Sequence, residues 1–195
     1  MKQSESDEVR LTSLIEENER LHAALLEMRK RIAELEQLAD TDTLMPLPNR
    51  RAFMRRLESV VQYAARHETP AAVLYIDLDG LKRINDDHGH HIGDAVLLHL
   101  ARLLTDSLRA TDMVARIGGD EFGLILDHLN EADATAKAKA LSDYVSAQQV
   151  DVGAATIAIR VTIGLAMVRA GESVASLVER ADAAMYANRN HRSQM

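Results

Sequence analysis

Residues 118–121, Gly-Gly-Asp-Glu, are the part of this sequence best suited to carry chemistry. Apolar runs at 113–117 and 122–126 flank them, which predicts a β-hairpin with the two acids at its tip. We expect the glycines to supply the positive φ of a tight turn and to let phosphates approach the backbone. Adjacent carboxylates suit Mg²⁺, which binds one or two acids together with substrate phosphates. On these four residues alone, an ordinary hairpin with a polar tip is the alternative.

A second candidate is Asp77, which ends the apolar run 71–77. Such a run predicts a buried strand, and an acid at its end can hold a metal ion. A turn acid without a catalytic role is the alternative for Asp77 taken alone. The nearby His88, His90 and His91 allow a second metal interpretation, a Zn²⁺ site completed by carboxylates. We prefer the metal site at Asp77 to the Zn²⁺ site, because adjacent histidines in a glycine-containing loop do not share one face.

The elements that position these residues follow an N-terminal helical segment. Residues 9–40 show the heptad pattern of a coiled coil of about four heptads. Asn18 falls at an a position, where a buried Asn typically fixes register and strand number. We therefore expect a parallel dimer; a long helix packed on its own domain is the alternative. The seam comprises Leu11, Leu14, Leu21, Leu25, Met28, Ile32 and Leu35.

Polar residues and prolines at 40–48 end this pattern and predict a boundary between residues 1–40, the coiled-coil helix, and residues 41–195, a globular domain. The domain is expected to be an α/β (α+β) sheet covered by helices. The expected elements are helix 49–67, strand 71–77, helix 94–108 capped by Asp94, hairpin strands 113–117 and 122–126, helix 131–147, strand 156–168 bent at Gly164, and helix 174–189.

Composition narrows the function classes. The chain has no cysteine, which excludes disulfides and thiol chemistry. A net charge of −7 and 3% aromatic residues argue against a nucleic-acid surface. No apolar run reaches the length of a membrane span, and the first residues are polar and acidic, unlike a secretory signal. We therefore expect a soluble, cytoplasmic protein without nucleic-acid or membrane partners.

The segment Gly118–Phe122 resembles the signature of the GGDEF family, bacterial diguanylate cyclases that join two GTP into cyclic di-GMP and release two pyrophosphates. The resemblance covers residues 41–192 and rests on several motifs in the right order. It implies a domain like the palm of nucleotidyl cyclases and polymerases, with a mixed five-stranded sheet and the hairpin beside the 71–77 strand. It also implies a dimer, because the 3′-hydroxyl of each GTP attacks the other GTP. The implied cofactor is Mg²⁺, for which Mn²⁺ can substitute.

The resemblance assigns roles to individual residues. Two acids and a main-chain carbonyl are implied as metal ligands, with further groups for phosphate, guanine and product. The metal ligands are Asp77, the Leu78 carbonyl and Asp120; Glu121 is a second ligand or a base helper for the 3′-hydroxyl; Lys82 and Arg189 reach the triphosphate; Gly118 and Gly119 admit phosphates; Asn85 and Asp94 recognise guanine; Arg109 and Asp112, an Arg-x-x-Asp pair, form an inhibitory product site for cyclic di-GMP.

The chain departs from the family pattern at several positions. Met45-Pro46 replaces the usual Thr-Gly of the entry motif, and Leu81 stands where Phe is frequent. Arg189 takes the position of a phosphate-binding Lys, and Ser193 that of an Arg. Ala140 stands where the product site often has a second arginine, with lysines nearby.

Two other functions compete with an active cyclase. One is a receptor that binds GTP or cyclic di-GMP without catalysis, and the other is a coiled-coil scaffold that docks a partner. Retention of Asp77 and of all four residues 118–121 favours the enzyme. The sequence does not name the input signal, for which a regulatory protein on the N-terminal helix is one source.

Overall fold

The structure of the protein is a computed structural model that describes residues 2–152 and 156–192. The chain divides into two compact units, Met1–Asp40 and Thr41–Met195. The first unit is one helix, α1 (Lys2–Asp40). Within a single chain, the predicted seam is exposed: the side chains of Leu14, Leu21, Leu25, Met28 and Ile32 are 52–63% accessible. Leu11 and Leu35 of the same seam lie outside the described side chains.

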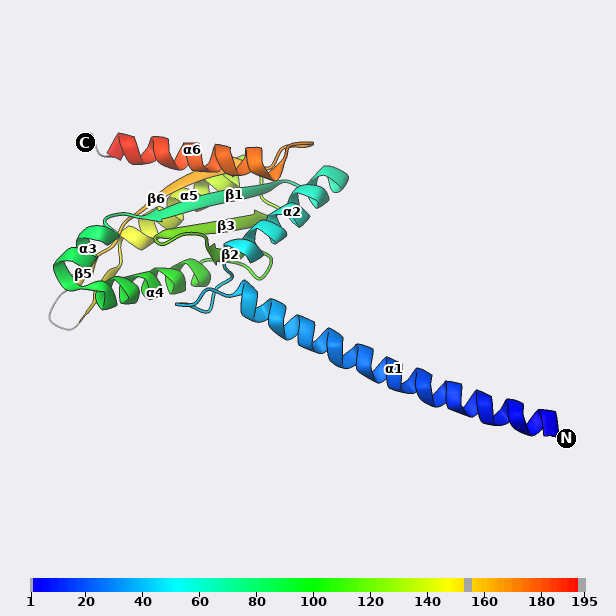
Figure 1. Ribbon diagram of the computed structural model, residues 1–195. Helices are drawn as coiled ribbons and strands as arrows, with labels where there is room; N and C mark the ends of the chain where they lie inside the picture. The colour runs from blue at the N-terminus through cyan, green and yellow to red at the C-terminus, as the bar shows by residue number, and fades with distance from the viewer. Residues whose placement is uncertain (1, 153–155, 193–195) are drawn as a thin grey trace. The chain divides into compact units, whose positions relative to one another are not determined.

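The second unit is built around a four-stranded sheet in the order β2-β3-β1-β6, with helices on both faces (Figure 1). Each neighbouring pair in this sheet is antiparallel. The elements are α2 (Arg50–His67), β1 (Ala71–Leu78), α3 (Leu81–His88), α4 (His90–Asp106), β2 (Met113–Arg116), β3 (Glu121–Asp127), α5 (Glu131–Ser146), β4 (Gln149–Asp151), β5 (Thr156–Ala158), β6 (Val161–Met167) and α6 (Val174–Arg192).

The expected sheet covered by helices is confirmed, but the mixed five-stranded sheet is not what the described residues form. β4 and β5 make a separate two-stranded sheet. The strand expected over 156–168 is interrupted at residues 159–160, between β5 and β6. There the Arg160 carbonyl accepts a hydrogen bond from the Asp79 backbone N–H (3.0 Å). The two halves of the expected strand therefore join different sheets.

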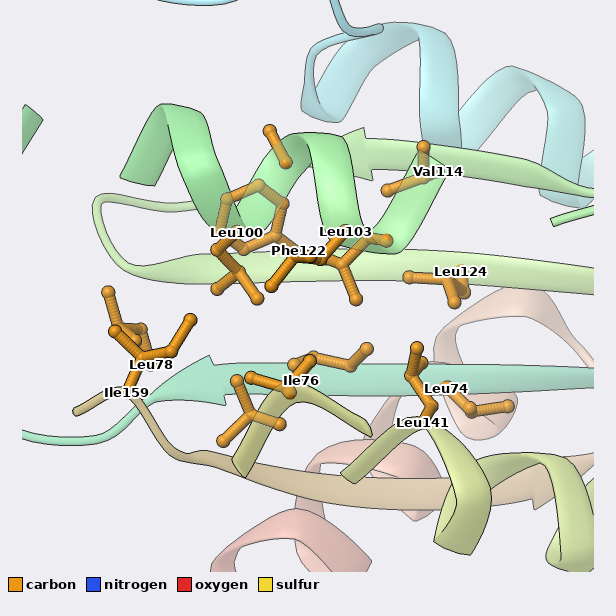
Figure 2. Close-up of a cluster of buried hydrophobic side chains, with 14 of the residues drawn as sticks. Leu74, Ile76, Leu78, Leu100, Leu103, Val114, Phe122, Leu124, Leu141 and Ile159 are labelled. Atoms are coloured by element: carbon orange, nitrogen blue, oxygen red, sulfur yellow. The ribbon is translucent and has the colours of Figure 1, made fainter. Parts of the chain in front are cut away.

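Strand β1 lies between two hydrophobic clusters, which explains its continuous apolar run. Successive side chains of a strand point to opposite faces, and all eight residues of β1 are buried. Leu74, Ile76 and Leu78 face a cluster with side chains of α4 and α5 (Figure 2). Val73 and Tyr75 face a second cluster with side chains of α2 and α6. The central strand is thereby fixed on both faces, which makes it a rigid support for the acid at its end.

The region 81–106 differs from the sequence prediction. It contains two helices, α3 and α4, joined at Gly89 with φ 87°. Asp94 was expected to cap a helix starting there, and this is wrong: α4 begins at His90, with Gly89 at its N-cap position. Helix α3 is only eight residues long and contains two apolar residues, Leu81 and Ile84, which are too few to establish a helical period from the sequence.

Strand β6 continues through Gly164, which lies opposite Tyr75 in an unbroken register with β1. A Cβ added at Gly164 would lie 2.2 Å from the Ala181 carbonyl oxygen and 2.2 Å from the Met185 nitrogen, both in the backbone of α6. The glycine is therefore needed for close contact between helix and strand. On the same helix, Arg180 donates a 2.6 Å hydrogen bond to the Met167 carbonyl.

Candidate active site

The site forms where β1 ends beside the hairpin. Asp77 lies opposite Glu121 in the antiparallel pairing of β1 with β3. The Leu78 N–H donates to the Asp120 carbonyl at 3.0 Å, one step beyond that pair. The expected neighbourhood of the hairpin and the 71–77 strand is confirmed. Two segments more than forty residues apart in the sequence thus bring their acids to one end of the sheet.

The turn itself differs from the expectation that its glycines adopt positive φ. Neither Gly118 nor Gly119 does so. Instead, the Ile117 and Gly118 N–H groups both donate to the Glu121 carbonyl (2.9 and 3.2 Å). A Cβ at Gly118 would lie 2.2 Å from Oε2 of Glu121, whereas one at Gly119 meets nothing within 4 Å. Gly118 therefore makes room for the Glu121 carboxylate, and Gly119 faces open space.

Arg116 holds this turn, and the sequence analysis did not identify it. Its Nε and Nη2 donate to the Gly119 carbonyl at 3.2 and 2.7 Å. Its Nη1 donates to Oδ1 of Asp42 at 3.1 Å. Asp42 also accepts from the backbone N–H groups of Leu44 and Met45 (2.9 and 3.2 Å). The Gly-Gly-Asp-Glu turn is thereby tied to the segment that opens the second unit, whose Met45 is buried in the core.

Asp77 is the most perturbed acid of the site. It is 3% exposed, and its Oδ2 accepts a 3.0 Å hydrogen bond from Nη1 of Arg189 on α6. Its buried Oδ1 has no hydrogen-bond partner in the described part of the chain. Burial raises the pKa of the Asp77 carboxyl from 3.8 to about 6, against the lowering effect of Arg189. The carboxylates of Asp120, Asp79 and Glu121 raise this pKa further. The arrangement favours binding of a cation beside Asp77.

The donor set fits a cation that takes much of its shell from elsewhere. Within residues 2–152 and 156–192, no three His, Cys, Asp or Glu side chains form a ligand group by themselves, the three histidines included. Mg²⁺ commonly binds one or two carboxylates and completes its octahedron with water and substrate phosphates. The unpartnered Oδ1 of Asp77 is the kind of oxygen such an ion requires.

A second part of the site lies where α3 meets α4. Oδ1 of Asn85 on α3 is buried, and none of the described residues forms a hydrogen bond with it. A Cβ at Gly93 would lie 1.9 Å from that oxygen, so glycine at this position lets α4 approach Asn85. Lys82 and Asp94 are exposed on the same two helices. Neither is hydrogen bonded or ion paired to Asp77 or Asn85 within the described part of the chain.

The family model described as "Diguanylate cyclase, GGDEF domain" matches residues 39–195. This chain belongs to the GGDEF family. Its sequence is 42% identical over 154 residues to the bifunctional diguanylate cyclase/cyclic di-GMP phosphodiesterase MucR of Pseudomonas aeruginosa, covering 78% of this chain and 22% of MucR. It is 38% identical over 159 residues to diguanylate cyclase TpbB of the same organism, covering 79% and 36%. The chain thus spans only about a fifth to a third of these relatives.

Solved GGDEF structures share the fold. Diguanylate cyclase SiaD of Pseudomonas aeruginosa, in complex with its activator SiaC, matches with a TM-score of 0.77 and 31% identity, over 96% of this chain and 72% of SiaD. The coiled coil and GGDEF domain of DgcB from Caulobacter crescentus, in complex with c-di-GMP, matches with a TM-score of 0.79 and 28% identity, over 92% and 95%. None of the described helices of this GGDEF protein is long and apolar enough to cross a membrane.

The Arg-x-x-Asp pair of this GGDEF domain lies in the turn before β2. The Asp112 side chain is 2% exposed, and its Oδ2 accepts from the Arg109 backbone N–H at 3.1 Å. Its Oδ1 accepts from the Asp127 N–H at 3.4 Å, and Nζ of Lys137 on α5 lies 3.7 Å from Oδ2. Asp112 therefore fixes the turn from inside, while the Arg109 side chain is exposed. Lys137 lies one helical turn before Ala140.

Proposed function

We propose that this GGDEF domain is a diguanylate cyclase that condenses two GTP into cyclic di-GMP and two pyrophosphates. The observation that carries the proposal is the buried Asp77, with one unpartnered oxygen, paired across the sheet with Glu121 of an intact Gly-Gly-Asp-Glu turn. The diguanylate cyclase names of MucR and TpbB support the same activity. Its substrate places the proposed reaction in the cytoplasm.

The acids at the end of the sheet suit phosphoryl transfer. Asp77, the Leu78 carbonyl and Asp120 would hold Mg²⁺ or Mn²⁺, with Glu121 as a further ligand or as a base helper for the 3′-hydroxyl. A cation held there would neutralise charge on the phosphates that react. The Leu78 backbone is already fixed to the hairpin by its hydrogen bond to the Asp120 carbonyl. These groups therefore keep their positions before substrate binds.

Separate residues would bind the two ends of GTP. Lys82 and Arg189 are proposed to bind the triphosphate, near a turn where Gly119 leaves open space. Asn85 and Asp94 are proposed to recognise guanine. The buried amide oxygen of Asn85 has no partner among the residues that the structure describes, so a donor on the base would satisfy it. A carboxylate such as Asp94 accepts from the N1–H and N2–H₂ donors that distinguish guanine from adenine.

Dimerisation through α1 is the second part of the proposal. Each GTP attacks the other, so two domains must face each other. The exposed seam of α1 offers an apolar face for a second copy of the chain. The match to the coiled coil and GGDEF domain of DgcB covers 92% of this chain. This share is larger than the second unit, Thr41–Met195, so the match includes part of α1. A regulatory protein acting on this helix would be the source of the input signal, as SiaD has an activator protein.

Product inhibition is the third part. The Arg109 side chain is exposed, and the Arg109 backbone N–H holds the Asp112 carboxylate in place within the same turn. Arg109 and Asp112 are proposed to bind cyclic di-GMP together. Lys137 adds a cation 3.7 Å from that carboxylate. The c-di-GMP complex of DgcB shows that a related GGDEF protein binds this product.

The deciding experiment incubates the purified chain with GTP and Mg²⁺ or Mn²⁺ and identifies the product by chromatography and mass spectrometry. We expect cyclic di-GMP and pyrophosphate. Asp120→Ala should fold but lose activity by orders of magnitude, because it removes a ligand charge from outside the core. Asp106→Asn, at an exposed position at the end of α4, is the matched control and should stay active. Nucleotide binding without product would indicate a receptor instead.

A further inference from the structure

We propose that Arg189 competes with the divalent cation for Asp77, so that metal binding releases this arginine to the triphosphate of the substrate. The inference rests on the proposed function, because it concerns the same metal and the same nucleotide. It adds a role for Arg189 before substrate arrives. In that role the guanidinium serves as the internal counter-ion of a buried carboxylate.

The contacts of Asp77 carry this inference. Its two oxygens differ: Oδ2 is bound to Arg189 at 3.0 Å, and Oδ1 is buried with no hydrogen-bond partner among residues 2–152 and 156–192. The negative charges of Asp79, Asp120 and Glu121 act on the same carboxylate. A buried carboxylate in such surroundings requires a positive charge, and removal of the Arg189 side chain that pairs with it would be strongly destabilising. A divalent cation on Oδ1 would supply that charge and make the guanidinium redundant.

The backbone around Arg189 is fixed, so the exchange must take place in the side chain. Gly164 lets the backbone of α6 at Ala181 and Met185 lie directly against β6. The preceding residue, Asn188, donates a 2.8 Å hydrogen bond to the Ile163 carbonyl. The Arg189 side chain itself is 47% exposed, so its guanidinium can leave Asp77 for a ligand in solvent. An arginine suits this second partner because its planar fork matches phosphate geometry.

Exchange of one partner for another couples the two ligands. If the metal displaces Arg189, it raises the affinity for triphosphate, and triphosphate must raise the affinity for metal by the same factor. Either ligand alone therefore binds with lower affinity than it does in the presence of the other. The domain would therefore hold metal weakly until GTP is present and would bind the two together.

The first test measures Mn²⁺ binding to the nucleotide-free full chain by electron paramagnetic resonance, at a pH well above the pKa of Asp77. Arg189→Gln should bind Mn²⁺ about fivefold or more tightly than the wild type, the lower end of typical coupling between sites. Arg189→Lys should stay near wild type, because it keeps a cation. The matched control is Arg83→Gln, an exposed arginine on α3, which removes the same charge and should change nothing. Equal or weaker binding to Arg189→Gln overturns the inference.

A second measurement uses the wild-type chain and does not depend on a variant's folding. The arginine side-chain Nε–H resonances are followed by NMR as Mg²⁺ is added without nucleotide, and the spectrum of Arg189→Lys identifies the Arg189 signal. This signal should move toward that of a solvent-exposed guanidinium. The Arg116 signal should not, because its partners are the Gly119 carbonyl and Asp42. An Arg189 signal that stays unchanged at saturating Mg²⁺ refutes the exchange.

These readouts separate the inference from the proposed function. If Arg189→Gln binds Mn²⁺ more tightly but the wild type forms no cyclic di-GMP, the competition stands and the cyclase assignment fails. If the wild type forms cyclic di-GMP and Arg189→Gln binds Mn²⁺ no better, the cyclase stands and the competition fails.

Discussion

Substitution of Gly164 by alanine tests whether close packing of α6 on β6 supports both the fold and the site. The new Cβ would lie 2.2 Å from two backbone atoms of α6, those of Ala181 and Met185, where ordinary contacts begin at 3.4 Å. Helix and strand must therefore separate by roughly 1 Å, and added volume in a packed interface typically costs about 1–3 kcal/mol. The same shift would lengthen the 3.0 Å contact between Arg189 and Asp77 beyond hydrogen-bond distance.

Thermal unfolding followed by circular dichroism measures the effect. For a domain of this size, that cost corresponds to a fall in Tm of roughly 2–12 °C. The matched control is Gly119→Ala, because its Cβ meets nothing within 4 Å and its φ is not positive. The control should unfold within about 0.5 kcal/mol of wild type, as most surface changes do. The reasoning is refuted if Gly164→Ala is as stable as Gly119→Ala.

The remaining predictions concern product, assembly and pH. Arg109→Ala should weaken cyclic di-GMP binding in calorimetry and relieve product inhibition; unchanged affinity would reduce the Arg-x-x-Asp pair to a structural turn. Replacement of both Leu25 and Ile32 by charged residues should give monomers by light scattering and low activity at high dilution. In the wild type, the paired helices hold two domains at an effective concentration in roughly the millimolar range. Raising the protein concentration should therefore partly restore the specific activity of the variant. A double variant that stays dimeric would contradict this. The pKa of Asp77 is higher in the folded state, about 6, than its ordinary value of 3.8. As pH rises from 3.8 to about 6, the free energy of unfolding of the nucleotide-free and metal-free protein should therefore fall by roughly 2–3 kcal/mol. Urea unfolding should show this loss in the wild type and not in Asp77→Asn.

Local signals in the sequence predicted much of the fold. Asn49 was expected to open a helix, and its side chain accepts from the N–H groups of Arg51 and Ala52 at the start of α2. The apolar run ending at Asp77 became a fully buried strand, because both faces of β1 are covered. Each of these features depends on residues close together in the chain, where side-chain type and spacing carry the information.

Features that depend on distant partners could not be predicted in this way. Arg116 and Asp42 lie 74 positions apart, and neither carries a signal that it will meet the other. The role of Gly118 depends on where the Glu121 side chain folds, not on its own φ. The pairing of Arg189 with Asp77 joins the last helix to the first strand. The resemblance to a family named Gly118, Glu121, Asp77 and Arg189, but not Arg116 or Asp42, and the contacts of all six come from the tertiary structure.

The edges of the sheet bear on how safely this protein can meet its own copies. An unpaired edge strand is a template for uncontrolled pairing with another chain, which leads to aggregation. At one edge, side chains of α6 bind the β6 carbonyls of Ile163 and Met167. At the other edge, β2 is only four residues long. Both edges are therefore poor templates, so two copies held together by the proposed seam of α1 should be able to separate again without joining their sheets into fibrils.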